Sequence, residues 1–267
     1  MARVLPPGLR RTLRRPLARY RHTGLQPADV LLVSYPKSGS TWLRFLLAHA
    51  LTSREADFDS VRDSVPPAGR HRRGQALLPR GGRLVKSHEP LRPYLGRRDQ
   101  PVIYLVRDGR DVALSFLDHE RRIGRFDGDA VEFVDRFLAG AVGSYGAWND
   151  HVLAALELEH AGAHPFLRVR YEDLRQSPVA ELARILEFLG IEPDPGALAD
   201  IVAANTKDRM RAKEATSAFL ASMTTDGTPF VRPERPAGWS DLVPEDVRTR
   251  SERALAPVLR ACGYTVT

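Results

Sequence analysis

Cysteine is nearly absent from this 267-residue sequence, in which Cys262 is the only one. A single cysteine cannot form a disulfide within the chain, so nothing here requires an oxidising compartment. Long apolar runs are missing too: no segment reaches the roughly 18 uninterrupted apolar residues that indicate a membrane-spanning helix. The basic N-terminal segment is not followed by the apolar stretch of a secretion signal. We therefore expect a cytoplasmic protein with no membrane span.

The composition also excludes a disordered chain and a fibrous repeat. Hydrophobic residues make up 43% of the sequence and charged residues 27%, which is the ordinary balance of a globular protein. The length permits a substantial core and lies near the upper end of what one domain holds. We expect a single domain over residues 28–267, preceded by a basic and irregular arm over residues 1–27.

Negative charge is the scarcer sign, because the formal net charge is +7. Arginine supplies most of the positive charge and is concentrated in two tracts, residues 10–21 and 70–83. A basic surface favours an anionic partner, which leaves nucleic acid, anionic lipid and a small polyanion as alternatives. The same charge would allow the N-terminal arm to contact a membrane surface. The richness in arginine and alanine favours a bacterial source.

Short apolar runs alternate with helical patterns along the chain. Four runs have the length and composition of buried strands: Val30–Val33, Arg83–Val85, Val102–Val106 and Phe166–Val169. Helical spacing of apolar residues follows at 41–51, 131–138, 152–158, 177–190 and 246–261. This alternation predicts an α/β fold with a central, mainly parallel sheet that helices cover on both faces. Ligands of such folds lie beyond the carboxyl ends of the strands.

The segment 35–42 joins the first predicted strand to the first predicted helix. The N-terminus of a helix presents unpaired N–H groups and the positive end of the helix dipole, which together favour an anion. Lys37 adds a full charge, and Gly39 lets the backbone approach a ligand closely. Three hydroxyl side chains complete the loop: Ser38, Ser40 and Thr41. A Walker A loop has its lysine after the glycines, whereas Lys37 precedes Gly39, so the loop predicts a P-loop-like phosphate site that is not a metal-dependent NTPase.

The sequence YPKSGSTW at residues 35–42 resembles the donor-binding loop of cytosolic-type sulfotransferases, YPKSGTTW. Further segments resemble motifs of that family and occur in the same order: KSH at 86–88, RDGRDVALS at 107–115, GSYGAWNDHV at 143–152 and YED at 171–173. The resemblance extends from about Val30 to Trp239. It implies an enzyme that transfers a sulfuryl group from 3′-phosphoadenosine 5′-phosphosulfate (PAPS) to an acceptor and that needs no metal.

The resemblance implies three catalytic residues. His88 is the general base that takes the acceptor's proton, and imidazole suits this role because its pKa lies near neutral pH. Lys37 stabilises the charge that develops on the leaving phosphate. Lys86 lies two residues before His88, on the same face if the segment is extended, and assists the leaving group.

The resemblance also implies the groups that bind the donor. The 5′-phosphosulfate lies against the loop 37–41, and the 3′-phosphate against Arg107, Ser115 and Arg232, of which an arginine can bind phosphate with two nitrogens. Trp42 stacks on the adenine and Tyr171 contacts its edge. We assign no ligand role to the carboxylates between Arg107 and Ser115.

Two segments depart from the family pattern. The family motif RKGxxGxW corresponds to RPERPAGW at 232–239, where Pro233 has no N–H and Glu234 and Ala237 replace glycines. Arg232 can still reach a phosphate, but backbone contacts after it are in doubt. The segment Asn205–Lys207 replaces a Thr-Ser-Phe segment, which puts an adenine-side contact in doubt as well.

The acceptor is a hydroxyl or an amine of a small-molecule, lipid or sugar compound. We expect it to be chosen by loops at 52–82, 118–130 and 206–240, and the sequence leaves a monomer and a homodimer open. Two other functions remain as alternatives: a P-loop kinase, and a non-catalytic protein that binds a polyanion. We expect no nucleic-acid partner, because neither an aromatic RNA platform nor a helix-turn-helix pattern is present.

Overall fold

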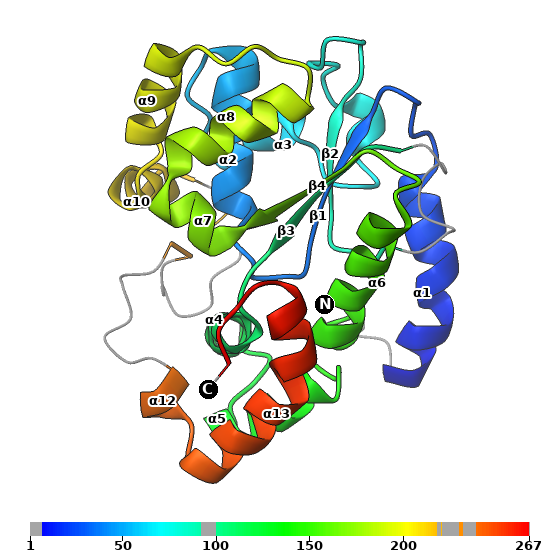
Figure 1. Cartoon of the computed structure of the whole chain (residues 1–267), viewed down its shortest axis with the longest axis vertical. Coiled ribbons are helices and arrows are strands. Elements are labelled where there is room, and N and C mark those ends of the chain that lie inside the picture. Colours follow the sequence, from blue (N-terminus) through cyan, green and yellow to red (C-terminus); the bar gives the residue numbers. More distant parts are fainter. Residues whose placement is uncertain (1–6, 92–99, 218–219, 221–229, 232–238, 267) are drawn as a thin grey trace.

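The computed structural model describes residues 7–91, 100–217, 220, 230–231 and 239–266. Its centre is a four-stranded sheet in the order β2-β1-β3-β4, in which every neighbouring pair is parallel. The strands are β1 (Val30–Ser34), β2 (Leu84–Ser87), β3 (Val102–Val106) and β4 (Phe166–Arg170). The predicted α/β fold with a parallel sheet is confirmed (Figure 1).

Helices cover both faces of the sheet, which is why the two central strands, β1 and β3, are almost wholly apolar and buried along their length. One face carries α2 (Ser40–Thr52), α8 (Pro178–Phe188) and α9 (Pro195–Ala204), and the other carries α4 (Gly109–Arg122), α5 (Ala130–Leu138), α6 (Trp148–Ala161) and α13 (Glu245–Ala261) (Figure 1). Side chains alternate between the faces: Val30 and Leu32 pack with α2, α8 and α9, whereas Leu31 and Val33 pack with the other layer. Each of these side chains stabilises the fold by about 1.5–3 kcal/mol through burial.

Six shorter or peripheral helices complete the described chain. They are α1 (Pro7–His22), α3 (Val61–Ser64), the 3₁₀ turn η1 (His71–Arg73), α7 (Tyr171–Gln176), α10 (Lys207–Ala215) and α12 (Trp239–Leu242). Within the described residues, no helix combines the length and the apolar character that crossing a bilayer requires.

Several predicted boundaries hold. Helix α8 begins with Pro178 after Ser177 and is followed by Gly190 at φ 75°, as the pattern at 177–190 predicts, although the Ser177 side chain does not cap the helix. Strand β2 is longer than the predicted run Arg83–Val85 and takes in Lys86, because Lys86 pairs in parallel register with Leu32 of β1.

Other segments differ from the expectation. The arm 1–27 was expected to be irregular, but most of it forms α1, even though Pro16 inside the helix removes one backbone donor. The expected loop at 206–240 begins with α10, which Thr206 caps by accepting a hydrogen bond from the Arg209 N–H at 3.5 Å. The expected loop at 118–130 starts inside α4, which continues to Arg122.

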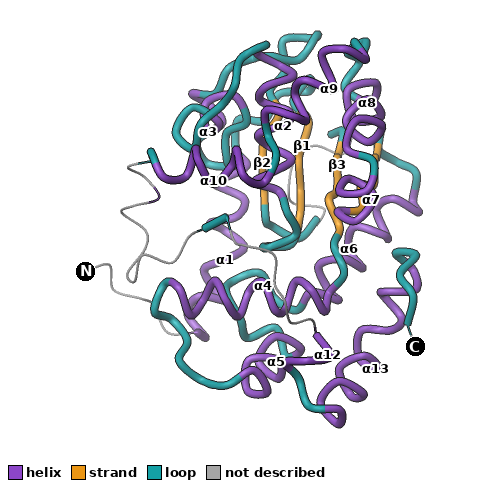
Figure 2. Tube along the Cα trace, turned by 90° about the vertical axis from the view of Figure 1, so that its left-hand side faces the viewer, coloured by secondary structure: helices purple, strands orange, loops and turns teal. Residues whose placement is uncertain are grey.

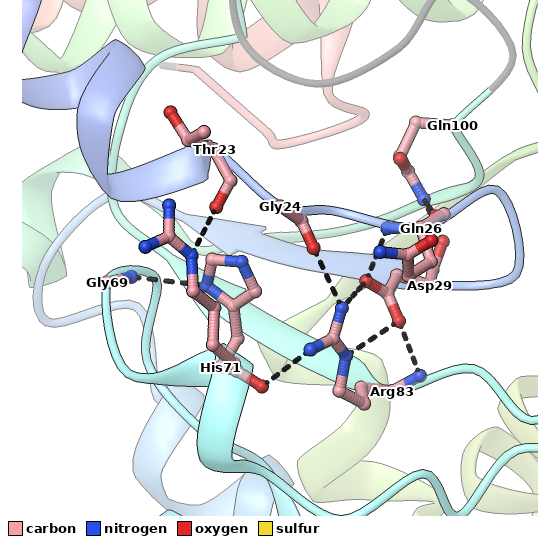
Figure 3. Close-up of polar contacts among 9 residues, drawn as sticks. Thr23, Gly24, Gln26, Asp29, Gly69, His71, Arg83 and Gln100 are labelled. Atoms are coloured by element: carbon pink, nitrogen blue, oxygen red, sulfur yellow. Dashed lines mark hydrogen bonds and ion pairs between the residues drawn. The ribbon is translucent and has the colours of Figure 1, made fainter.

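A buried ion pair joins the start of β1 to the start of β2 (Figure 3). The Arg83 guanidinium donates to both carboxylate oxygens of Asp29, at 3.0 and 2.6 Å, and also to the carbonyls of Gly24 and His71. Burial alone would raise the pKa of Asp29, but the hydrogen bonds from Arg83 outweigh it and lower that pKa. The carboxylate is therefore charged at neutral pH and holds two segments together.

We expect Asp29→Ala to destabilise the protein, because it leaves the largely buried Arg83 cation without its partner. Breaking such a pair costs about 3–5 kcal/mol, which lowers the melting temperature by about 10 °C in a domain of this size. Thermal denaturation tests this, with the exposed Asp59→Ala as control. Because the pKa of Asp29 is lowered, the contribution is present at neutral pH and is lost as pH falls through that pKa. Equal melting temperatures for the two variants would contradict the prediction.

Candidate functional site

All four strands deliver a predicted site residue at the same edge of the sheet. The loop 35–39 follows β1, His88 follows β2, Arg107 follows β3, and Tyr171 follows β4. Parallel strands end on one side, so residues from distant parts of the sequence gather there. In Figure 2, α4 crosses beneath this edge. From β1 the chain continues to β2 on one side, and from β3 it continues to β4 on the other side, so the strand order reverses between the neighbours β1 and β3. In parallel sheets a ligand crevice is expected at such a point.

The loop after β1 has the backbone shape of an anion-binding turn. Lys37 and Gly39 have positive φ angles, 71° and 94°, and the Ser38 N–H donates to the Tyr35 carbonyl at 3.3 Å. Successive N–H groups in such a turn point into one concavity. A β-carbon at Gly39 would overlap the ring of Tyr171, so only glycine suits this position.

Gly39→Ala is expected to disrupt the loop. Alanine at φ 94° is strained, and its methyl group would displace Tyr171. Binding of adenosine 3′,5′-bisphosphate should weaken at least tenfold, by roughly 1.4 kcal/mol or more. Titration calorimetry measures this, with Gly162→Ala as the matched control, since Gly162 has φ 62° but open space around a β-carbon. Equal binding by both variants would show that the Tyr171 contact does not matter.

Three cations surround the loop. Burial, together with the charges of Arg122 and Arg107, lowers the pKa of Lys37 to about 8, and the charge of Glu120 acts in the opposite direction. The Arg107 guanidinium also donates to the Lys37 carbonyl at 3.3 Å. Mutual repulsion among neighbouring cations is unfavourable unless an anion joins them. The site is therefore electrostatically prepared for a polyanion.

One face of α4 lies toward these cations. Ser115, His119 and Arg122 are spaced four and three residues apart, so they share that face. The guanidinium of Arg122 donates to His119 Nδ1 at 3.0 Å, and burial, with the nearby charges of Lys37 and Arg122, lowers the pKa of His119 to about 3. His119 is therefore neutral. Sequence reasoning found Ser115 but missed Arg122, which the same helical spacing would have indicated.

Two buried polar atoms in the site are available to a ligand. Among the described residues, neither Ser38 Oγ nor Arg107 Nε has a hydrogen-bond partner. The rest of Arg107 is held in place: one terminal nitrogen lies 3.3 Å from the Asp111 carboxylate, and the guanidinium lies 4.6 Å from the ring centroid of Tyr171. A buried donor without a partner is costly, and phosphate oxygens would satisfy both atoms.

The geometry around His88 sets its protonation. Nδ1 lies 2.8 Å from the Ser34 carbonyl, which can only accept, so Nδ1 carries the proton and Nε2 is the basic nitrogen. Burial and the nearby charge of Lys86 lower the pKa of His88 well below its usual value, although the bond to Ser34 acts in the opposite direction. The imidazole is therefore neutral at physiological pH. Tyr145 packs edge-on against its ring at 5.6 Å.

A second buried histidine supports His88 from behind. His151 Nε2 lies 3.0 Å from the His88 carbonyl, and its Nδ1 lies 2.8 Å from the Tyr104 hydroxyl. A carbonyl only accepts, so Nε2 donates and Nδ1 accepts from the tyrosine. The side chains of His151 and Tyr104 are almost completely buried. His151 belongs to the GSYGAWNDHV segment, so the sequence pointed to its neighbourhood without indicating this contact.

Lys86 lies on β2, two residues before His88, and its charge lowers the pKa of His88. Burial lowers the pKa of Lys86 itself well below its usual value, and the charge of Arg44 acts in the same direction. Arg44, whose guanidinium donates to the Val65 carbonyl at 3.1 and 2.6 Å, was not predicted as part of the site.

The predicted adenine-side residues have protein partners of their own. The Trp42 indole N–H donates to the Asn205 carbonyl at 2.9 Å, and its ring meets Tyr171 edge-on at 6.3 Å. The Asn205 side chain donates to the Ile201 carbonyl at 2.8 Å and accepts from Lys213 at 3.1 Å. The Asn205 backbone carbonyl therefore positions Trp42, and the Asn205 side chain is held by protein groups.

The remaining predicted contact lies outside the described residues. Arg232 and the altered segment up to 238 belong to that part of the chain. Phe230, just before it, was not predicted, yet its ring centroid lies 5.1 Å from Lys37 Nζ and 5.3 Å from the Arg122 guanidinium. The described residues contain no group of three or more side chains placed to hold a metal ion.

A protein-family model of the sulfotransferase domain matches residues 27–263. The chain belongs to the sulfotransferase family. This sulfotransferase is 31% identical to mouse sulfotransferase 1B1 over 233 residues, which cover 80% of this chain and 77% of the mouse protein. It is 32% identical to dog sulfotransferase 1A1 over 220 residues, which cover 75% and 70% of the two chains. These relatives are mammalian and do not support the expected bacterial source.

Solved structures share the fold of this sulfotransferase. Retinol dehydratase in complex with androsterone and the inactive cofactor PAP superposes with a TM-score of 0.74 at 20% identity, covering 94% of this chain and 86% of that one. Mouse sulfotransferase SULT7A1 complexed with PAP gives a TM-score of 0.70 at 21% identity, covering 94% and 90%. At this level of identity the similarity establishes the fold.

Proposed function

We propose that this enzyme transfers the sulfuryl group of PAPS to a hydroxyl or amine of a small-molecule, lipid or sugar acceptor, with His88 as general base. The observation that carries the proposal is the juxtaposition of the basic Nε2 of His88 with the cationic loop at one edge of the sheet. Family membership supports sulfuryl transfer, and the relatives solved with PAP support the nucleotide. The unpartnered Ser38 and Arg107 atoms fit its phosphates.

The proposed reaction is an in-line displacement at sulfur. The acceptor's O–H or N–H bond breaks and its proton moves to His88 Nε2, while the acceptor atom forms a bond to sulfur. The bond between sulfur and the bridging phosphate oxygen breaks, and adenosine 3′,5′-bisphosphate leaves with that electron pair. Lys37 stabilises the negative charge on the departing oxygen, and Lys86 assists from the adjacent strand. Fixed positions for these groups lower the entropic part of the barrier.

The 3′-phosphate and the adenine of the donor bind at the ends of the other strands. Arg107, just after β3, and Ser115, on the face of α4 that lies toward the cations, bind the 3′-phosphate together with Arg232. Arg122 joins them, because its charge acts on Lys37 from the same helix face. Trp42 and Tyr171 flank the adenine. The binding of an anion would raise the pKa of Lys37 and so keep it charged during the reaction.

A thermal-shift experiment tests whether the enzyme binds the proposed nucleotide. At a concentration 100 times its dissociation constant, adenosine 3′,5′-bisphosphate should stabilise the protein by about 2.7 kcal/mol, which corresponds to about 5–10 °C in melting temperature. ATP with Mg²⁺ should give a smaller shift. Sulfate transfer from labelled PAPS to a panel of phenols, alcohols, amines, sterols and sugars then identifies the acceptor class. A larger shift with ATP and Mg²⁺ would favour the kinase alternative and contradict the proposal.

A further inference from the structure

The two arginine tracts, which the reaction does not use, lie next to each other on the surface. Residues 1–28 contain seven arginines and no aspartate or glutamate, and residues 64–88 also lack both acids. The first tract forms α1, and the second contains η1. The guanidinium of Arg72 donates to the Thr23 carbonyl at 3.1 Å, just after α1, and lies against the ring of Tyr20 within the first tract. Helix α1 also precedes the part of the chain that the family model matches.

The C-terminal half of α1 is anchored to the domain. His22 is buried, and its Nε2 lies 3.0 Å from Ser87 Oγ, at the end of β2. Ala18 is buried one turn earlier in the helix. The ion pair of Arg83 with Asp29 fixes the linker after the helix (Figure 3). The outer face of this half-helix is therefore a rigid surface.

The exposed side of the half-helix combines apolar and cationic side chains. Leu17 is 46% exposed and Tyr20 68%, and they lie on one face because they are three residues apart. Arg15 and Arg19 are exposed beside them, and Arg72 and Arg73 are exposed on η1. The Arg72 guanidinium lies 6.0 Å from the ring centroid of Tyr20. Among the described residues, none of these four arginines forms an ion pair.

We propose that this arginine surface, formed by Arg15, Leu17, Arg19, Tyr20, Arg72 and Arg73, docks on an anionic lipid bilayer. Charge complementarity provides the attraction, at about 1 kcal/mol for each basic residue near such a surface. The exposed leucine and tyrosine favour a bilayer over nucleic acid, because an aliphatic side chain and an amphipathic ring both gain by entering the headgroup region. Docking would bring the domain to the membrane surface. The helix that docks is anchored to Ser87, the residue directly before His88.

Vesicle sedimentation with the full-length protein tests the proposal. The wild type should bind phosphatidylcholine vesicles that contain phosphatidylserine at least tenfold more tightly than vesicles of phosphatidylcholine alone, and salt should weaken the binding. Arg19→Glu with Arg72→Glu should reduce binding at least tenfold, since each reversal removes about one favourable charge contact and adds repulsion. Arg253→Glu, at an exposed arginine of α13, is the control and should bind like the wild type.

A second variant separates lipid from other polyanions. Leu17→Ser with Tyr20→Ser should weaken vesicle binding roughly tenfold but leave retention on heparin and on duplex DNA unchanged, because only the bilayer has an apolar interior. Leu242→Ser, at a leucine 38% exposed on α12, is the matched control. Melting temperatures should be unchanged for all four variants. Binding to both kinds of vesicle alike, binding to neither, or equal loss on vesicles and on DNA would overturn the proposal.

Discussion

His88→Ala is expected to abolish transfer almost completely while leaving nucleotide binding intact. General-base catalysis contributes about 10²–10⁴ in rate, so kcat/KM should fall by that factor. The nucleotide affinity should not change, because the ring is held by the Ser34 carbonyl and Tyr145, and neither belongs to the phosphate loop. Initial rates of sulfate transfer and calorimetric titration with adenosine 3′,5′-bisphosphate measure the two quantities separately.

The control for this variant is His160→Ala, because His160 is exposed on α6 and outside the site. The pH profile adds a readout that a purely structural role would not affect. Since the pKa of His88 is lowered well below the ordinary histidine value, the neutral base persists down to acidic pH, and kcat/KM should show no fall as pH passes through the pKa range of an ordinary histidine. Transfer by His88→Ala at the wild-type rate would remove His88 from the mechanism.

Lys37→Met should reduce kcat by about 10²–10³, comparable to the loss of one donor that stabilises a developing charge. The affinity for adenosine 3′,5′-bisphosphate should fall by less, about tenfold, because Arg107 and Arg122 remain as cations around the loop. The reason for this difference is that negative charge on the leaving oxygen grows in the transition state. Single-turnover kinetics and titration calorimetry measure the two effects, with Lys207→Met on α10 as the control.

The pH dependence gives Lys37 a distinct signature. Its pKa is about 8 in the free enzyme, so the charged form is lost as pH rises through that value. The wild-type kcat/KM should therefore decline above pH 8, and Lys37→Arg should remove this alkaline limb because arginine stays charged. If Lys37→Met weakens nucleotide binding and transfer by the same factor, Lys37 only binds the donor.

Much of the site could be predicted because its residues are carried by short local patterns. A buried strand followed by a lysine, a glycine and hydroxyls predicts an anion-binding turn, whatever the rest of the chain does. Each of His88, Arg107 and Tyr171 directly follows a strand of the structure and lies within three residues of the end of a predicted one, and parallel strands end together. The sheet and its ligand-bearing edge therefore followed from periodicity and strand ends alone.

Other features were missed because they depend on contacts between distant segments. Helix α1 contains Pro16 and a dense run of arginines, which disfavour a helix locally, yet His22 and Ser87 tie its end to the sheet. Phe230 meets Lys37 and Arg122 only after the chain returns to the site. The contact of His151 with the His88 carbonyl crosses 63 residues of sequence and leaves no periodic pattern.

The loop at residues 35–42 was recognisable from its order of residues, since the groups that form an anion-binding turn occupy consecutive positions in the sequence. Its reactivity was not recognisable in that way. The pKa of Lys37, near 8, arises from burial and from the charges of Arg122, on α4, and Arg107, just after β3. The protonated nitrogen of His88 follows from a carbonyl on β1. Residue types are local properties, whereas charge states and tautomers depend on the field and the hydrogen bonds that packing creates, and these exist only in the folded chain.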